Sequence, residues 1–113
     1  MSTQASDRDA LMQGTLDLLI LRILSLGSYH GQGVARLIQA RSGDTLIVDH
    51  GSLYPALQRL EQREWIDSEW RTTDNNRRAK YYRLTAKGRR ALSIETDSWR
   101  RYVTAVEDIL AVT

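Results

Sequence analysis

The stretch from Asp49 to Glu61 constrains the fold of this chain most, because it has the pattern of one short helix with two different sides. Leu53, Leu57 and Leu60 recur at i, i+4 and i+7, which is the spacing of one buried stripe on an α-helix. Asp49 precedes that stripe and predicts an N-cap, since its carboxylate can accept hydrogen bonds from the free amides of the first turn. The opposite side carries polar, neutral or basic residues, namely Ser52, Pro55, Gln58, Arg59 and Gln62, with Tyr54 at its edge.

A helix face of this kind, without an acidic side chain at its middle, has two interpretations. It is typical of a helix that enters the major groove of DNA, where Arg and Gln side chains read base edges. It is equally typical of an ordinary solvated helix. The helix by itself leaves both interpretations open, so the rest of the chain has to distinguish them.

Two motifs in the chain resemble the PadR family of winged-helix transcriptional regulators. The first is the run Gly51–Leu57 (GSLYPAL), followed by Arg59–Glu61 (RLE), which looks like the signature of the family. The second is the run Arg77–Thr85 (RRAKYYRLT) with Gly88, which is similar to the family's wing and the start of its last helix. The resemblance spans roughly Leu11 to Leu110, and the short C-terminal part is like that of the smaller family members, which have a single C-terminal helix.

The resemblance implies an α+β fold that is mostly helical, a winged helix-turn-helix with N- and C-terminal dimerisation helices. We divide the chain into a flexible N-terminal arm at residues 1–10, a winged helix-turn-helix DNA-binding domain at 11–84 and a C-terminal dimerisation helix at 85–113. Besides the helix that starts at Asp49, the sequence predicts helix Leu11–Leu26, helix Gly31–Arg41, strand Thr45–Val48, half-buried strand Trp65–Thr72, a turn at Asp74–Asn76, strand Lys80–Leu84 and a last helix from Ala86, capped by Thr85.

The end of the signature helix departs from the family pattern. This helix is expected to end near Arg63, which Glu64 follows. The family usually has a glycine where Glu64 stands, and glycine supplies a left-handed backbone conformation at low cost. Because glutamate adopts that conformation less readily, we expect the helix to end in a different turn.

Positive charge in this chain is concentrated in one segment rather than large overall. The formal net charge is +2 over 113 residues, a length that fits one domain. From Arg71 to Arg90, however, eight cationic residues stand against the single acid Asp74. Such a local excess is expected of a site for a polyanion.

The residues expected to bind DNA come from the signature helix and the wing. Arg77, Arg78 and Lys80 lie at or beside the expected wing tip, where the neighbouring motif favours phosphate or minor-groove contacts over a merely solvated tip. Tyr54 fits equally well as an aromatic residue at the core edge and as a phosphate-binding hydroxyl. The complete predicted set is Ser52, Tyr54, Pro55, Gln58, Arg59, Arg77, Arg78 and Lys80.

Two helices carry more apolar surface than a small winged domain can cover. The helix at Leu11–Leu26 is apolar on nearly all sides, interrupted by Asp17 and Arg22, and the last helix has an apolar stripe along its length. Pairing between two subunits would cover both surfaces, so we expect a homodimer whose interface contains Leu16, Leu19, Ile20, Ile23, Trp99, Tyr102, Val103, Val106 and Leu110. Trp99 has a second interpretation, because in some family members an aromatic residue of the last helix lines a small-molecule pocket between subunits.

Several other classes of protein lack support in this sequence. Cysteine is absent, which excludes disulfides, thiol catalysis and cysteine-based zinc sites. His30 and His50 lack a metal-ligand spacing, and the chain has no Gly-x-Ser-x-Gly, His-Glu-x-x-His or P-loop lysine motif. No segment approaches the ~20 apolar residues that span a bilayer, and the N-terminus lacks the pattern of a signal peptide. We therefore expect a cytoplasmic protein that is not an enzyme and has no cofactor, no metal and no membrane partner.

The sequence as a whole predicts a sequence-specific DNA-binding transcriptional regulator. The symmetry of a homodimer implies a double-stranded operator with an inverted repeat, whose half-sites lie about one helical turn or a multiple apart. The resemblance implies repression that a ligand or signal relieves, for which a small apolar or aromatic effector is the candidate. Two alternatives stay open: a winged-helix module that binds another protein, and a small-molecule sensor that uses Trp99 and contacts DNA secondarily.

Overall fold

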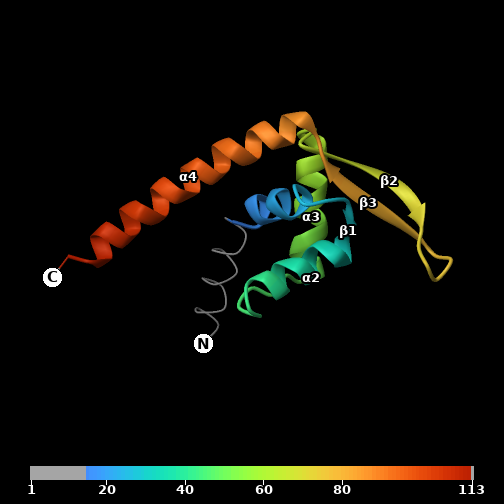
Figure 1. Cartoon of the computed structure of the whole chain (residues 1–113), viewed down its shortest axis with the longest axis horizontal. Helices are drawn as coiled ribbons and strands as arrows, with labels where there is room; N and C mark the ends of the chain where they lie inside the picture. The colour runs from blue at the N-terminus through green and yellow to red at the C-terminus, as the bar shows by residue number, and fades with distance from the viewer. Residues whose placement is uncertain (1–14, 113) are drawn as a thin grey trace.

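The computed structural model describes residues 15–112, so the predicted arm at residues 1–10 lies outside the described residues. The described chain begins with a helix at residues 15–24, within the range predicted for the first helix. The elements that follow are β1 (Tyr29–His30), α2 (Gly31–Arg41), α3 (His50–Gln62), β2 (Ile66–Thr72), β3 (Arg78–Leu84) and α4 (Ala86–Leu110), as Figure 1 shows. This helix-rich α+β arrangement, with a hairpin after α3, confirms the predicted winged helix-turn-helix class.

The signature helix α3 forms where the sequence predicts it. Leu53, Leu57 and Leu60 are fully or almost fully buried, which confirms the apolar stripe. Asp49 caps the helix, because its Oδ1 accepts a hydrogen bond from the Ser52 amide at 2.8 Å. The predicted side of α3 therefore faces the core, and its other side is left for a second role.

The core joins the helix at residues 15–24, α2, α3 and the inner ends of β2 and β3. Leu16, Ile20 and Ile23 belong to this core and are almost completely buried within the chain itself. Their predicted place in a dimer interface is therefore corrected, because the domain already covers them. Leu19 is partly buried against the same core. The apolar character of the first helix follows largely from its central position in the domain.

The sheet has three antiparallel strands in the order β1-β3-β2. β1 pairs with Tyr81 and Tyr82 of β3. The predicted strand at Thr45–Val48 is wrong, because β1 takes the third place in the sheet and this run instead connects α2 to α3. The apolar character of the run Thr45–Val48 is explained by Val48, whose side chain is buried in the core.

β2 and β3 form a long hairpin that projects from the domain (Figure 1), with a register from Ile66 opposite Leu84 to Thr72 opposite Arg78. The prediction of a half-buried strand holds for the start of β2 only. Ile66 is buried, whereas Trp70 is 59% exposed. The reason is that the hairpin extends past the core, so its outer half meets solvent.

The end of α3 differs from the expectation, because Glu64 does adopt the left-handed conformation, with φ of 63°. The Trp65 amide donates to the carbonyl of Leu60 at 3.1 Å, and the Glu64 amide donates to the carbonyl of Glu61 at 3.0 Å. These two bonds make a Schellman motif, the usual glycine-type helix end. Thr85 supports it from the start of α4, since its hydroxyl donates to the Glu64 carbonyl at 2.7 Å. The prediction of a different turn is therefore wrong.

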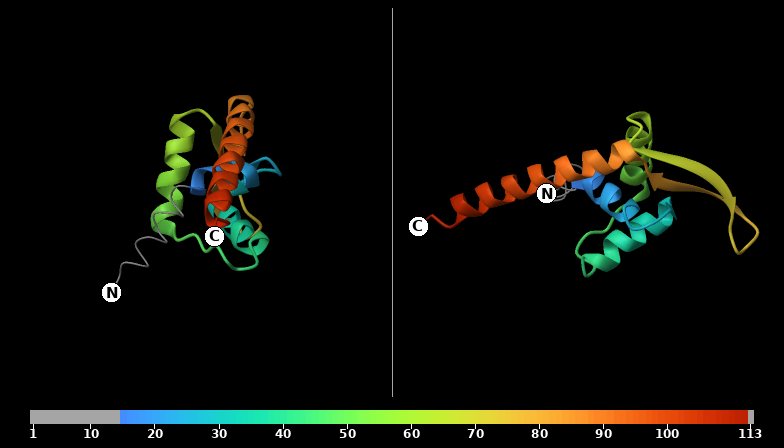
Figure 2. Two further views of the ribbon diagram at one scale, coloured as in Figure 1. Left: turned by 90° about the vertical axis from the view of Figure 1, so that its left-hand side faces the viewer. Right: turned by 45° about the horizontal axis from the view of Figure 1, so that its top comes forward.

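The last helix, α4, begins within the domain and then leaves it (Figure 2). Thr85 caps it as predicted, with Oγ1 accepting from the Gly88 amide at 2.9 Å. Gly88 lies so close to the start of β2 that a Cβ atom there would overlap the carbonyl oxygen of Trp65. Gly88 and Ala91 are the buried residues of α4. Within the described residues, no helix has the length and apolarity needed to cross a membrane.

Candidate nucleic-acid interface

The side of α3 opposite its buried stripe is open to solvent. Pro55, Gln58 and Gln62 are exposed on that side, and Ser52 beside them is half-buried. These positions follow each other at helical spacing, so they form one continuous outer face. That face offers amide donors and acceptors without a carboxylate, which is the chemistry that reads base edges.

Tyr54 lies between this outer face and α2. Its ring meets the His50 ring edge-on, with 5.8 Å between centroids. Gly31 at the start of α2 makes room for it, because a Cβ atom there would come within 2.9 Å of Tyr54 Cε1. Tyr54 is thus an aromatic residue of the core edge that remains 44% exposed. A phosphate contact from its hydroxyl stays a prediction.

Arg59 lies on a flank of α3 rather than at the centre of its outer face. Its Nη2 forms an ion pair with Oδ1 of Asp17, a residue of the first helix, at 2.8 Å. The side chains are 45% and 26% exposed, so the pair is accessible to water. The structure therefore separates Arg59 from Gln58, two residues that the sequence placed on one DNA-reading face.

The other flank of α3 faces the hairpin, and Glu61 connects the two. Oε2 of Glu61 accepts a hydrogen bond from the Ser68 hydroxyl of β2 at 2.6 Å. Oε1 accepts from Nζ of Lys80 on β3 at 3.2 Å. Lys80, which the sequence predicts to contact DNA from the wing, is thus already in an ion pair. Local sequence patterns do not predict this arrangement, because the three residues come from three different elements.

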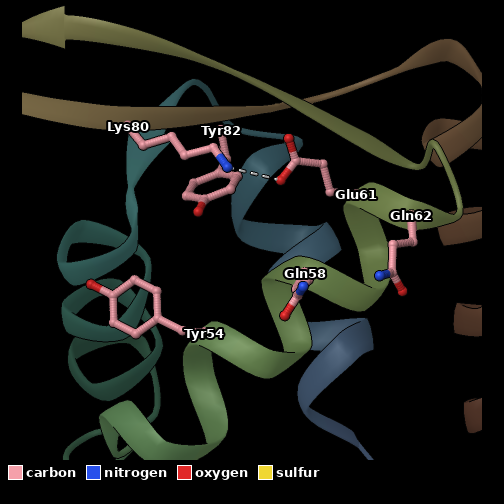
Figure 3. A pocket seen from close by; sticks show the side chains of 6 residues that line it. All are labelled: Tyr54, Gln58, Glu61, Gln62, Lys80 and Tyr82. Carbon is pink, nitrogen blue, oxygen red and sulfur yellow. Dashed lines mark hydrogen bonds and ion pairs between the residues drawn. The ribbon is translucent and has the colours of Figure 1, made fainter.

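An open pocket lies between α3 and β3, as Figure 3 shows. We call it the helix–wing groove. Its volume is about 450 Å³, and its lining residues are Tyr54, Gln58, Glu61, Gln62, Lys80 and Tyr82. Burial raises the pKa of Tyr82, an effect that nearby Lys80 partly offsets. The Tyr82 hydroxyl therefore stays protonated at neutral pH and can donate a hydrogen bond. The charged residues that line the groove are Lys80 and Glu61.

The outer part of the hairpin carries exposed cations beside exposed aromatic rings. Arg77 and Arg78 are exposed at the end of the wing. The Arg78 guanidinium lies over the ring of Trp70, 5.3 Å from its centroid. Nη2 of Arg71 forms an ion pair with Oε1 of Glu69 at 2.6 Å. Trp70 was not predicted to be a surface residue, since strand alternation alone assigns it to a half-buried face.

Arg83 lies on the other face of the hairpin, where it pairs with Asp67. The distance from Nε to Oδ1 is 2.6 Å, and the two residues stand opposite each other in the register of β2 and β3. The hydrogen bond to Asp67, followed by the attraction of its charge, raises the pKa of Arg83. Both side chains are about half exposed or more. This pair resembles that of Lys80 in kind but lies outside the helix–wing groove.

The two histidines have structural partners. Nδ1 of His30 accepts from the Gly33 amide at 3.1 Å and so caps α2. The Gln32 side chain lies 2.8 Å from Nε2 of His50. Among residues 15–112, no group of three or more metal-ligating side chains comes together.

The predicted dimer residues of α4 lie along the part that projects from the domain (Figures 1 and 2). Trp99 is 41% exposed and lies 6.1 Å from Tyr102, measured between ring centroids. Val103 and Val106 are half-buried on the same side of the helix, and Leu110 is exposed near its end. The stripe is thus continuous, and whether a second subunit covers it stays a prediction.

The fold and the open α3 face beside a basic hairpin define a protein of the winged-helix class. The sequence pattern of the "Transcriptional regulator PadR-like family" matches residues 20–94. The chain therefore belongs to the PadR-like family of transcriptional regulators, as its two motifs predicted. Members of this family are regulators of transcription and not enzymes.

Proteins of known sequence or structure agree with this assignment. An uncharacterised protein from Lysinibacillus sphaericus is 29% identical over 92 residues, which is 81% of this chain and 84% of that protein. A PadR family transcriptional regulator from Eggerthella lenta is 26% identical with a TM-score of 0.83, covering 99% of this chain and 96% of its own. A PadR family transcription regulator from Clostridium difficile is 29% identical with a TM-score of 0.73, covering 86% and 99%.

Proposed function

We propose that this protein is a homodimeric repressor that binds an inverted-repeat operator in double-stranded DNA. The observation that carries the proposal is the open outer face of α3, with Gln58 at its centre, beside a wing that ends in Arg77 and Arg78. α3 enters the major groove, where a glutamine can pair bidentately with adenine. The wing cations neutralise phosphates of the flanking backbone.

The α4 stripe supports the homodimer. Trp99, Tyr102 and Leu110 are exposed on a helix that leaves its own domain, and an exposed apolar stripe of this length usually marks an interface. Two chains joined through α4 hold their two α3 helices at a fixed separation. Two-fold symmetry of the protein then requires two-fold symmetry of the operator.

The wing is tested by a double substitution, Arg77→Ala with Arg78→Ala. The affinity for operator and for random duplex falls alike, because phosphate contacts carry no base sequence. The slope of log K against log salt decreases by about 0.9 for each lost phosphate contact. Fluorescence anisotropy with labelled duplex over a salt series measures both quantities. Arg100→Ala with Arg101→Ala, which removes the same charge from exposed positions of α4, is the matched control. An unchanged slope in the wing variant would remove the wing from the interface.

The reading face is tested by Gln58→Ala in a selection from randomised duplexes. Loss of a bidentate glutamine–adenine pair relaxes one position of each half-site by about 1–3 kcal/mol. The bound consensus of the wild-type protein should be an inverted repeat, and that of the variant should lose one base in each half. The same consensus for both proteins would show that α3 reads DNA through other residues.

A second candidate function, a small-molecule sensor, is favoured by the aromatic pair of Trp99 and Tyr102. A flat aromatic effector can stack on such rings where two subunits meet. Binding there would shift the separation of the two α3 helices and release the operator. Titration of small aromatic compounds into wild type and Trp99→Phe, followed by tryptophan fluorescence, tests this function. Steep salt dependence of DNA binding separates both candidates from a module that binds only protein.

A further inference from the structure

The helix–wing groove contains a lysine side chain that is already in an ion pair. Lys80 is the cation of the groove, and Glu61 Oε1 lies 3.2 Å from its Nζ. An ammonium group has three N–H donors, so one carboxylate oxygen leaves donors available. Lys80 and Glu61 are each about one-third exposed, which means that a ligand from solvent can reach the pair.

The other lining groups of the groove are also able to bind an anion. Gln58 and Gln62 contribute amides, and Tyr54 and Tyr82 contribute hydroxyls. All four can donate hydrogen bonds to phosphate oxygens. The pocket is open toward solvent between the outer face of α3 and the wing (Figure 3). Because this opening lies between the two elements proposed to contact DNA, the backbone that connects those two contacts would run past it.

We propose that the helix–wing groove is a subsite for one backbone phosphate of the operator, and that Glu61 competes with this phosphate for Lys80. This inference rests on the proposed DNA-binding function and adds a competitor to it. The carboxylate oxygen at Lys80 stands where a phosphate oxygen would bind. When DNA arrives, Lys80 exchanges one oxyanion for another.

Ser68 is what makes the exchange possible without leaving Glu61 unpaired. The Ser68 hydroxyl donates to Oε2 of Glu61 at 2.6 Å, whereas Lys80 donates to Oε1. After Lys80 turns to a phosphate, Glu61 keeps its hydrogen bond to β2. The ion pair therefore lowers the affinity of the protein for DNA, since it has to break before Lys80 can bind a phosphate.

The test compares four proteins: wild type, Glu61→Gln, Lys80→Met and the double variant. Glutamine keeps the size of Glu61 and an oxygen that can accept from Ser68, but it no longer neutralises Lys80. Glu61→Gln should bind a random-sequence duplex about three- to fivefold more tightly, the range expected for releasing an ion pair of this exposure. Its salt slope should stay close to that of wild type, because Lys80 binds the same phosphate in both proteins and only the cost of breaking the internal ion pair is removed. In the Lys80→Met background, Glu61→Gln should not tighten binding.

A matched control separates competition for Lys80 from a general loss of negative charge. Asp67→Asn frees Arg83 on the opposite face of the same hairpin, at a similar ion pair. Since strand residues alternate between faces, this change leaves the groove untouched. Its DNA affinity should stay close to that of wild type. Thermal melting followed by circular dichroism accompanies each protein, so that altered folding is recognised.

The outcomes distinguish this inference from the proposed function. If wild type binds no duplex at low salt, the proposed function fails, and the inference fails with it. If wild type binds but Glu61→Gln binds more weakly, Glu61 positions the wing and the competition is refuted. If Glu61→Gln tightens binding equally with and without Lys80, or if Asp67→Asn does the same, Glu61 acts by general repulsion and the phosphate subsite is refuted. In the last two cases the proposed function stands.

Discussion

Replacing Glu64 with glycine should stabilise the protein. Glu64 has φ of 63°, and a residue with a Cβ atom in the left-handed region costs roughly 1–2 kcal/mol relative to the right-handed one. Glycine removes this cost but adds about 0.5–1 kcal/mol of backbone entropy in the unfolded chain. Removing a negative charge just after a helix C-terminus adds a few tenths. The net gain is about 0.5–1 kcal/mol, which raises the Tm by about 2–6 °C for a domain of this size.

The assay is thermal denaturation at one fixed protein concentration, because the proposed dimer would make the Tm depend on concentration. Two controls bracket the result. Asn76 also has positive φ, at 58°, but asparagine tolerates this region, so Asn76→Gly should change the Tm little. Arg63 is right-handed at the end of the same helix, so Arg63→Gly should lower the Tm. A Tm for Glu64→Gly at or below that of wild type would refute the reasoning, and would mean that the Glu64 side chain contributes more than its backbone conformation costs.

Three further predictions concern the proposed dimer, the first helix and the start of α4. Val106→Asp places a carboxylate in each half of the expected α4 interface, so it should sediment as a monomer and bind operator weakly. Thr104→Asp adds the same charge outside the stripe and should remain dimeric. A dimeric Val106→Asp protein in sedimentation equilibrium would contradict the α4 interface. Asp17→Asn releases Arg59, so it should tighten operator binding up to about fivefold and lower the free energy of unfolding by less than about 1 kcal/mol. Unchanged affinity for the operator would mean that Arg59 only joins α3 to the first helix. Gly88→Ala gains about 1 kcal/mol of helix propensity but forces a methyl group onto the Trp65 carbonyl. The overlap should dominate and lower the Tm by several degrees. A raised Tm would show that α4 can shift at no cost.

Much of this fold could be predicted from the sequence because it depends on local patterns. The spacing of Leu53, Leu57 and Leu60 defined α3, and Asp49 and Thr85 marked the starts of two helices. Each of these signals lies within a few residues of the structure it specifies. The exposed outer face of α3 followed from the same spacing, so the residues Pro55, Gln58 and Gln62 were found without knowledge of the tertiary structure.

The missed features depend on residues far apart in the chain. Glu61 meets Ser68 and Lys80 from two other elements, and Arg59 meets Asp17 across 42 residues. Helix periodicity gives the direction of each side chain but does not identify what lies opposite. This is why two cations expected to be free for DNA are in ion pairs. The same limitation applies to the third strand, since β-branched composition cannot tell pairing in a sheet from burial of Val48 in the core.

Glu64 shows that a local preference can also lose to its surroundings. The left-handed conformation costs roughly 1–2 kcal/mol, whereas the two amide bonds of the Schellman motif and the Thr85 hydroxyl bond depend on it together. Each such bond contributes about 0.5–1.5 kcal/mol. Their sum exceeds the cost of the conformation, so the turn forms with glutamate. A residue's preference against the left-handed conformation therefore determines the backbone only where no other hydrogen bonds depend on that conformation.

The burial of the first helix within its own domain changes what the proposed dimer has to cover. Two apolar surfaces, one on each terminal helix, suggested that the first helix of one subunit pairs with α4 of the other. With Leu16, Ile20 and Ile23 inside their own core, the first helix offers little of that surface. The apolar stripe of α4 remains, with Trp99 and Leu110 exposed along it. We therefore expect α4 of the partner to supply much of the cover, which places two copies of Trp99 near the contact between subunits and makes the separation of the two α3 helices depend on how those α4 helices pack.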